Sequence, residues 1–222
     1  MSIEVNNTIS SIPSLSKSIL ERRSIRSGFI DIEIESDIVR EILDCGRSAP
    51  SSKNAQPWIF HAVTNKGILR AISEDIQCAK DADRFVPVNP VTGEKRGNLK
   101  STTVESAEIL GSVALGIFIE NSSHFSVSRK TVAQASDSIR EDAVIGLSLE
   151  YIGLGATIQN MWLAAEARDI RGVFMGDVLI SEEFIKRQLS FRGDLVGVLA
   201  LGYTSGEPSP KKTETENVYY HQ

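Results

Sequence analysis

The longest apolar-rich segment, residues 137–168, constrains the fold more than any other part of the chain. One of its faces is marked at helical spacing by Ile139, Ala143, Leu147, Leu154, Ile158, Met161 and Ala165. Its other faces carry Val144, Tyr151, Trp162 and Leu163. This spacing predicts one long helix, and a helix that is apolar nearly all round is enclosed in a large core or against another subunit. Gly153 and Gly155 each weaken it by roughly 1 kcal/mol relative to Ala, a cost that close helix–helix approach would explain.

Shorter apolar patterns predict the remaining elements. Helices are expected from Ser14 to Leu20, from Ser36 or Asp37 to Ala49, over residues 68–76, and after Ser181. Strands are expected over residues 58–63, 109–119 and 195–201, the last two buried on both faces. The elements mix without the regular alternation of a doubly wound fold. We expect a flexible lead at residues 1–13, one domain at 14–212 and a polar tail at 213–222.

The composition argues against several functional classes. A formal net charge of −5 and a pI near 5.3 argue against a nucleic-acid-binding surface. Cys45 and Cys78 form no metal-type spacing and the three histidines are scattered, so we expect no metal site. No apolar stretch approaches the roughly 20 residues that span a bilayer, and residues 1–13 lack the pattern of a signal peptide. We therefore expect a cytoplasmic protein without a nucleic-acid or membrane partner.

A polar segment that cannot be regular structure follows the second predicted helix: Ala49-Pro50-Ser51-Ser52-Lys53-Asn54-Ala55-Gln56-Pro57-Trp58. The chain must leave helical geometry before Pro50 and again before Pro57. Between the prolines lie two hydroxyls, an ammonium and two carboxamides, which suit the binding of a polar ligand. A solvated turn that opens the next strand explains these ten residues equally well, so other segments must decide.

Two basic clusters are candidate anion sites. The first, where the first helix ends, consists of Arg22, Arg23, Ser24 and Arg26. Guanidinium groups grip anions through charge-assisted hydrogen bonds. The second cluster, Lys211 and Lys212, follows the last predicted strand. Taken singly, each cluster is also explained as a solvated basic surface.

Four features, in their order along the chain, resemble the FMN-dependent nitroreductase superfamily. They are Arg22-Arg23-Ser24-Ile25-Arg26, the segment 49–58, the end of the long helix at Gln159-Asn160-Met161-Trp162-Leu163-Ala164-Ala165, and the last strand running into Gly202-Tyr203 with prolines and lysines behind it. The resemblance spans residues 15–212. It implies an α+β fold in which helices flank a central, mostly antiparallel sheet, with a long central helix at a homodimer interface.

The resemblance also implies where FMN binds. It assigns the phosphate, the ribityl chain and the pyrimidine edge to Arg22, Arg23, Ser24 and Arg26. A cation near flavin N1 favours the reduced form, so Arg26 would also tune the reduction potential. A flavin held by the partner subunit would be contacted by Pro50, Ser51, Ser52, Asn54 and Gln56. Met175 and Gly176 would approach the N5/O4 edge, and Lys211 or Lys212 would take the late phosphate position.

The implied activity is a ping-pong cycle in which NADH or NADPH reduces FMN, and the flavin then reduces a small organic acceptor such as a nitroaromatic compound or a quinone. No side chain is expected to act as nucleophile or general base. The polar segments 80–105 and 121–136 are expected to border the pocket, with Phe85 and Phe125 as substrate contacts. Two alternatives stay open: a flavin-dependent dehydrogenase or oxidase that tailors a metabolite, and an FMN-binding protein without catalysis.

Two features depart from the family pattern. Asp169 stands where many members have glycine. Aspartate is among the few other residues that tolerate left-handed backbone geometry, so the turn is expected to survive. The run Val173-Phe174-Met175 lacks the acidic residue that some members place beside N5, which predicts a more apolar flavin edge.

Overall fold

The computed structural model describes residues 15–82, 91–94, 101–124, 127–206 and 219. Its helices are α1 (Leu15–Glu21), α2 (Ser36–Arg47), α3 (Lys66–Cys78), α4 (Thr102–Ser112), α5 (Arg129–Gln134), α6 (Asp137–Glu166) and α7 (Glu182–Leu189). Two 3-10 turns are η1 (Ser52–Asn54) and η3 (Asp177–Ser181). The strands are β1 (Trp58–Val63), β2 (Leu115–Asn121), β3 (Arg171–Met175) and β4 (Asp194–Gly202).

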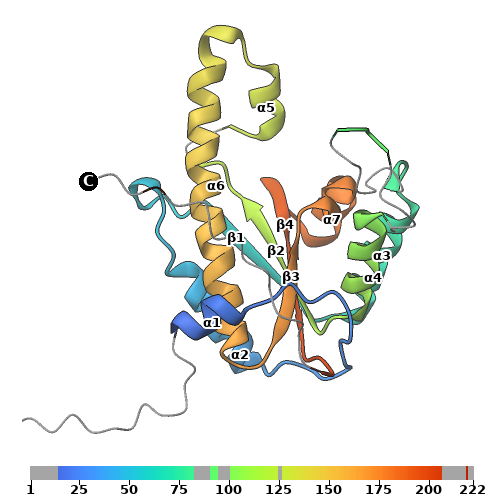
Figure 1. Cartoon of the computed structure of the whole chain (residues 1–222). Coiled ribbons are helices and arrows are strands. Elements are labelled where there is room, and N and C mark those ends of the chain that lie inside the picture. The colour runs from blue at the N-terminus through green and yellow to red at the C-terminus, as the bar shows by residue number, and fades with distance from the viewer. Residues whose placement is uncertain (1–14, 83–90, 95–100, 125–126, 207–218, 220–222) are drawn as a thin grey trace, which may run out of the picture.

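The four strands form one antiparallel sheet in the order β1-β2-β4-β3. Helices α2 and α6 cover one face, and α3, α4 and α7 cover the other (Figure 1). Side chains alternate along β2, so Ile117 and Ile119 enter the core under α6 while Phe118 enters the core under α3. The predicted α+β fold with a central antiparallel sheet flanked by helices is confirmed.

The predicted strand over residues 109–119 is wrong in its first part. Residues 109–112 complete α4, and the strand begins only at Leu115. Ile109 and Leu110 are buried on one side of that helix, and a short buried helical run cannot be distinguished from a buried strand by periodicity alone. The polar segments 80–105 and 121–136 contain the first turn of α4 and the whole of α5.

The long helix is confirmed as α6, and α2 packs closely against it. A Cβ at Gly46 would lie 2.6 Å from Met161 Cγ, so only glycine permits this approach. Thr157 Oγ1 donates a hydrogen bond of 2.6 Å to the Gly46 carbonyl. The expected role of Gly153 in helix–helix approach needs correction, because Gly153 makes room for the loop at residues 50–51. A Cβ at Gly155 would meet nothing within 4 Å, so Gly155 contacts no other described helix of its own protomer.

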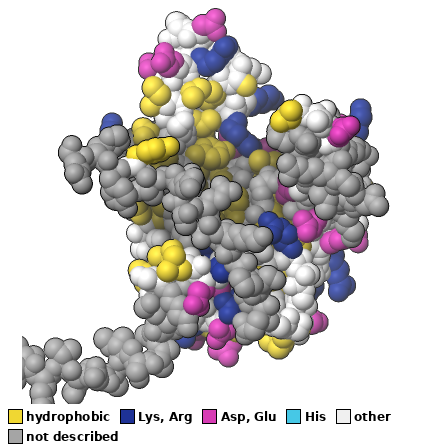
Figure 2. All heavy atoms as spheres, in the orientation of Figure 1, with side chains coloured by type: hydrophobic (Ala, Val, Ile, Leu, Met, Phe, Trp, Pro, Cys, Tyr) yellow, Lys and Arg dark blue, Asp and Glu magenta, His cyan; other side chains and the backbone are white. Residues whose placement is uncertain are grey.

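Part of α6 carries exposed apolar side chains that no described residue covers. They are Ile139, Val144, Ile145, Leu149 and Ile152, the last 70% exposed. Figure 2 shows apolar side chains gathered on the projecting part of the molecule that α6 forms with α5.

Within the described ranges, no helix combines the length and apolar character needed to span a bilayer. Nor does that part of the chain hold a group of three or more side chains suited to a metal ion.

A buried carboxylate pins the turn that leads into β4. Glu120 is 2% exposed, and its Oε1 accepts a hydrogen bond of 2.9 Å from the Arg192 backbone N–H and another from that of Gly193. His61 Nε2 lies 2.8 Å from Glu120 Oε2. Burial raises the pKa of Glu120, but the Gly193 and Arg192 N–H groups and His61 outweigh it, and the pKa falls below the usual 4.5. The ionised form is therefore the one that stabilises the fold.

We expect Glu120→Gln to lower the free energy of unfolding at pH 7 by about 1–3 kcal/mol, because buried N–H groups lose a charged acceptor. A carboxylate with a depressed folded pKa contributes stability above its unfolded pKa and loses it as the pH falls through the folded value. The variant should therefore lose less stability than the wild type between pH 5 and pH 3. Urea unfolding across this range measures it, with the exposed Glu74→Gln on α3 as control. Parallel acid profiles of wild type and Glu120→Gln would contradict the assignment.

Candidate functional site

The segment after α1 is tied to the start of β3. Ser24 forms a parallel β-bridge with Gly172, and the Ile25 backbone N–H donates a hydrogen bond of 2.9 Å to the Gly172 carbonyl. A Cβ at Gly172 would lie 2.1 Å from the Ala200 carbonyl oxygen, so the strand can carry only glycine here. The basic cluster predicted from the sequence therefore has a fixed place at the edge of the sheet.

Arg22 lies on an aromatic platform. Its guanidinium carbon lies 3.9 Å from the centroid of the Trp162 ring, and its Nε is buried with no hydrogen-bond partner in the described part of the chain. Burial lowers the pKa of Arg22, an effect that the negative charge of Glu166 opposes. Glu166 in turn pairs with Arg171 on β3. Burial raises the pKa of the Glu166 carboxyl, while Arg171 and the arginines after α1 act to lower it.

Arg26 is exposed, whereas Arg23 is half-buried like Arg22. Arg23 Nη1 donates hydrogen bonds of 2.9 Å to the carbonyls of Leu20 and Arg22, which close the end of α1. Arg26 Nη1 lies 3.3 Å from the Ser24 carbonyl, and its Nε lies 3.9 Å from Glu105 of α4. Ser24 itself is exposed. The segment thus presents a hydroxyl and several cations to solvent beside β3.

The polar loop between α2 and β1 has the backbone of a held, irregular structure. Lys53, Asn54 and Gln56 have φ angles of 51°, 57° and 49°, which few non-glycine residues adopt outside constrained sites. Ser51 Oγ accepts a hydrogen bond of 3.0 Å from the Gln56 backbone N–H, and the Gln56 carboxamide donates one of 3.0 Å to Asn54 Oδ1. The loop rests on α6, where Ser51 Cβ lies 3.3 Å from the position of a Cβ on Gly153. A plain solvated turn does not need such constraint.

The third predicted contact, Met175 and Gly176, lies at the far end of β3. Met175 is buried and Gly176 begins the η3 turn, which Ser106 of α4 holds through a hydrogen bond of 2.8 Å to Asp177. Gly176 lies four residue steps beyond Gly172, about 13 Å along the strand. The two groups therefore share one edge of the sheet.

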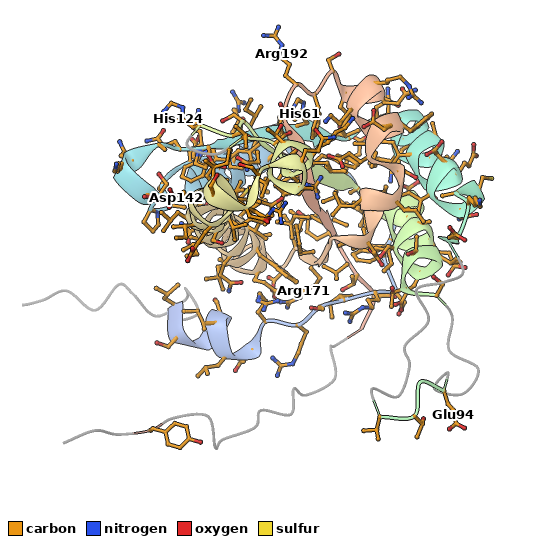
Figure 3. All side chains as sticks on the ribbon, turned by 90° about the horizontal axis from the view of Figure 1, so that it is seen from above. His61, Glu94, His124, Asp142, Arg171 and Arg192 are labelled. Atoms are coloured by element: carbon orange, nitrogen blue, oxygen red, sulfur yellow. The ribbon has the colours of Figure 1, made fainter. Side chains whose placement is uncertain are left out.

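The fold places the predicted site residues in two groups. The first basic cluster (Arg22, Arg23, Ser24 and Arg26), called the arginine cluster from here on, and residues 175–176 are both attached to β3. The 50–56 loop lies on the other side of α6 (Figure 1). Figure 3 shows Arg171 on the side that the segment after α1 crosses, and His61 and Arg192 on the opposite side. The remaining predicted residues, Phe85, Phe125, Lys211 and Lys212, lie outside the described ranges.

Three residues beside the arginine cluster were not predicted as site residues: Trp162, Glu166 and Arg171. Trp162 and Glu166 lie four residues apart on one helix and so share a face, which the sequence indicates. The contact of Trp162 and Glu166 with Arg22 depends on how the end of α1 crosses α6, and no local sequence pattern encodes that crossing. The expected left-handed backbone at Asp169 is confirmed by its φ of 57°.

Comparison with known proteins places this geometry in context. The family model described as "Nitroreductase family" matches residues 19–203. A nitrobenzene nitroreductase of Ectopseudomonas oleovorans is 27% identical over 168 residues, which cover 71% of each chain. The solved NADPH:FMN oxidoreductase of Vibrio harveyi, complexed with NAD+, has a TM-score of 0.62 at 19% identity and covers 94% of this chain and 79% of that one. Nitroreductase A of Vibrio parahaemolyticus has a TM-score of 0.62 at 20% identity, covering 94% and 77%. At these identities the two structures show a common fold.

Proposed function

The chain belongs to the nitroreductase family, and from this premise we propose that it is an FMN-dependent oxidoreductase that takes electrons from NADH or NADPH and passes them to a small organic acceptor. The observation that carries the proposal is the arginine cluster fixed on β3. Nitroaromatic compounds and quinones are the acceptor class that we infer, and the name of the nitrobenzene nitroreductase supports the nitroaromatic compounds.

The residues present fit the chemistry of FMN. Arg22, Arg23, Arg26 and Arg171 supply four guanidinium groups against the carboxylates of Glu105, Glu166 and Asp169. The cations outnumber these carboxylates, so the cluster suits a phosphate dianion. The buried Arg22 Nε has no hydrogen-bond partner among the described residues, and a phosphate oxygen would supply one. Arg22, Arg23 and Ser24 would then hold the phosphate and ribityl chain, with Lys211 or Lys212 as a further phosphate ligand.

The opposite end of β3 suits the flavin ring. Arg26 would lie at the pyrimidine edge, and the backbone of Met175 and Gly176 at the N5/O4 edge. Met175 is 4% exposed and Phe174 is half-buried, which makes this edge apolar. FMN, when bound, would supply the hydride chemistry in a ping-pong cycle. The protein would contribute orientation and charge, and no side chain acts as nucleophile or general base.

A homodimer would complete the site. The exposed apolar side chains of α6 form the kind of face that an obligate interface covers. The 50–56 loop is held on the side of α6 away from β3, so we infer that Pro50, Ser51, Ser52, Asn54 and Gln56 reach the flavin of the partner subunit. A Cβ at Gly155 would meet nothing within 4 Å in one protomer, which leaves room for the partner helix.

Anaerobic stopped-flow spectroscopy tests the function. We expect the purified protein to be yellow, and NADH or NADPH alone to bleach its visible flavin absorbance much faster than that of free FMN at the same concentration. A nitroaromatic compound or quinone should then restore the absorbance. Bleaching by an organic substrate but by neither nicotinamide would establish the dehydrogenase or oxidase alternative instead. A bound flavin inert to every reductant would indicate a non-catalytic FMN-binding protein.

A further inference from the structure

Three buried polar atoms that have no hydrogen-bond partner among the described residues lie where α1 ends against α6. They are Arg22 Nε, Trp162 Nε1 and Glu166 Oε1. Buried polar groups in folded proteins are almost always paired, and unpaired ones call for an explanation such as a bound ligand. Two of these atoms are donors without acceptors, and both belong to the pair in which the Arg22 guanidinium lies over the Trp162 ring.

The platform under Arg22 is rigid. Trp162 is 6% exposed and belongs to the core between α6 and the sheet, so packing fixes the plane of its ring. A guanidinium 3.9 Å from the ring centroid is within the range of a cation–π interaction, which strengthens as the cation loses water. Glu166 lies one helical turn further along, and its second oxygen is engaged by Arg171. The ring therefore fixes the position of the Arg22 guanidinium, whose Nε makes no hydrogen bond to any described residue.

We propose that Trp162 is a positioning residue that holds the Arg22 guanidinium in the plane from which it meets the phosphate of FMN. This inference rests on the proposed function. A side chain that is already ordered loses little freedom when the ligand binds, so the whole strength of the charge-assisted hydrogen bonds contributes to affinity. The platform acts on the phosphate end of the ligand alone, because Arg22 is the residue that it orders.

A packing role for Trp162 makes a different prediction. If the indole only filled the core, its loss would lower stability and weaken all flavins equally. If it positions Arg22, its loss weakens FMN, which has a phosphate, and spares riboflavin, which lacks one. The ratio of the two dissociation constants therefore separates the two roles.

The experiment measures the dissociation constants of FMN and riboflavin by flavin fluorescence titration. We expect Trp162→Leu to weaken FMN binding about tenfold, the equivalent of a cation–π interaction of roughly 1.4 kcal/mol, and to change riboflavin binding by less than about twofold. Trp162→Phe keeps a smaller aromatic face and should recover part of the loss. Ile158→Ala, a deletion in the same core of the same helix, is the matched control and should leave the ratio unchanged.

A double-mutant cycle with Arg22→Ala completes the test. In the Arg22→Ala background, Trp162→Leu should have no further effect on FMN, because the side chain that it orders is gone. Additive losses, or equal losses for FMN and riboflavin, would overturn the positioning role. If Trp162→Leu does not fold, the same cycle with Trp162→Phe decides, since its smaller ring predicts a loss of about threefold that vanishes without Arg22.

The cycle also separates this inference from the proposed function. If Arg22→Ala weakens FMN and Trp162→Leu does not, only the positioning role fails. If Arg22→Ala leaves FMN binding unchanged, the phosphate assignment itself fails, and the positioning role fails with it.

Discussion

Replacing both Arg22 and Arg26 by alanine is expected to weaken FMN binding by at least about a hundredfold. A hydrogen bond to a charged group contributes roughly 1.5–3 kcal/mol, and two such contacts correspond to about 3–6 kcal/mol, with a factor of ten for each 1.4 kcal/mol. Riboflavin should lose much less, since only the contact of Arg26 with the ring edge would be missing. Fluorescence titration with both flavins measures the difference.

The control must remove the same charge elsewhere. Arg70 and Arg187 are exposed on α3 and α7, across the sheet from α6, so Arg70→Ala with Arg187→Ala changes the net charge equally without touching the cluster. This control should bind FMN as the wild type does. FMN at a hundredfold excess over its dissociation constant should raise the unfolding free energy of the control by about 2.7 kcal/mol, and that of the site variant by much less at the same concentration. Equal FMN affinity in the two double variants would show that the arginine cluster is not part of the flavin site.

Hydrophobic patterning predicted most of the scaffold. The periodicity of residues 137–168, the apolar runs at 58–63 and 195–201 and the apolar stripe at 68–76 each predicted an element that the structure contains. Helix α3 buries one face, whereas every residue of strand β4 is buried. The same reasoning failed at residues 109–112, where a buried helix end and a buried strand look alike. The second helix does begin at Ser36, but it ends at Arg47, before the predicted Ala49.

The candidate site was predictable by composition but not by arrangement. Charge density in residues 22–26 and the two prolines around the 50–56 loop are visible in the sequence. The left-handed backbone at Lys53, Asn54 and Gln56 is not, because none of them is a glycine. The cluster of Arg22 with Trp162 and Glu166 joins residues about 140 positions apart and exists only through tertiary packing.

A heterodimer with substitutions in the arginine cluster of one subunit and in the 50–56 loop of the other is expected to recover a flavin site that both parent homodimers lack. One parent carries Arg22→Ala with Arg26→Ala. The other carries Ser52→Ala with Asn54→Gly, which removes two polar groups of the loop, while glycine keeps the left-handed backbone and the bond of Ser51 to Gln56 remains. Co-expression with two different tags and purification on both isolates the heterodimer, whose bound FMN is then counted.

The outcome depends on which subunit the loop serves. If the loop reaches the partner's flavin, the intact cluster of one subunit meets the intact loop of the other, and the heterodimer binds about one FMN per dimer at a concentration where both parents bind almost none. If the loop contacts the flavin of its own subunit, each site contains one substituted element and the heterodimer binds almost no FMN. An absence of any heterodimer would contradict the dimer itself.

A second heterodimer, with all four substitutions on one subunit and none on the other, reverses the expectation. A loop that crosses to the partner now damages the site of the unmodified subunit, so both sites fail and the dimer is empty. A loop that stays within its subunit leaves that site whole, with about one FMN per dimer. Since the two arrangements contain the same four substitutions, differences in folding or charge cannot produce opposite results. Opposite results in the two heterodimers can come only from the subunit whose flavin the 50–56 loop contacts.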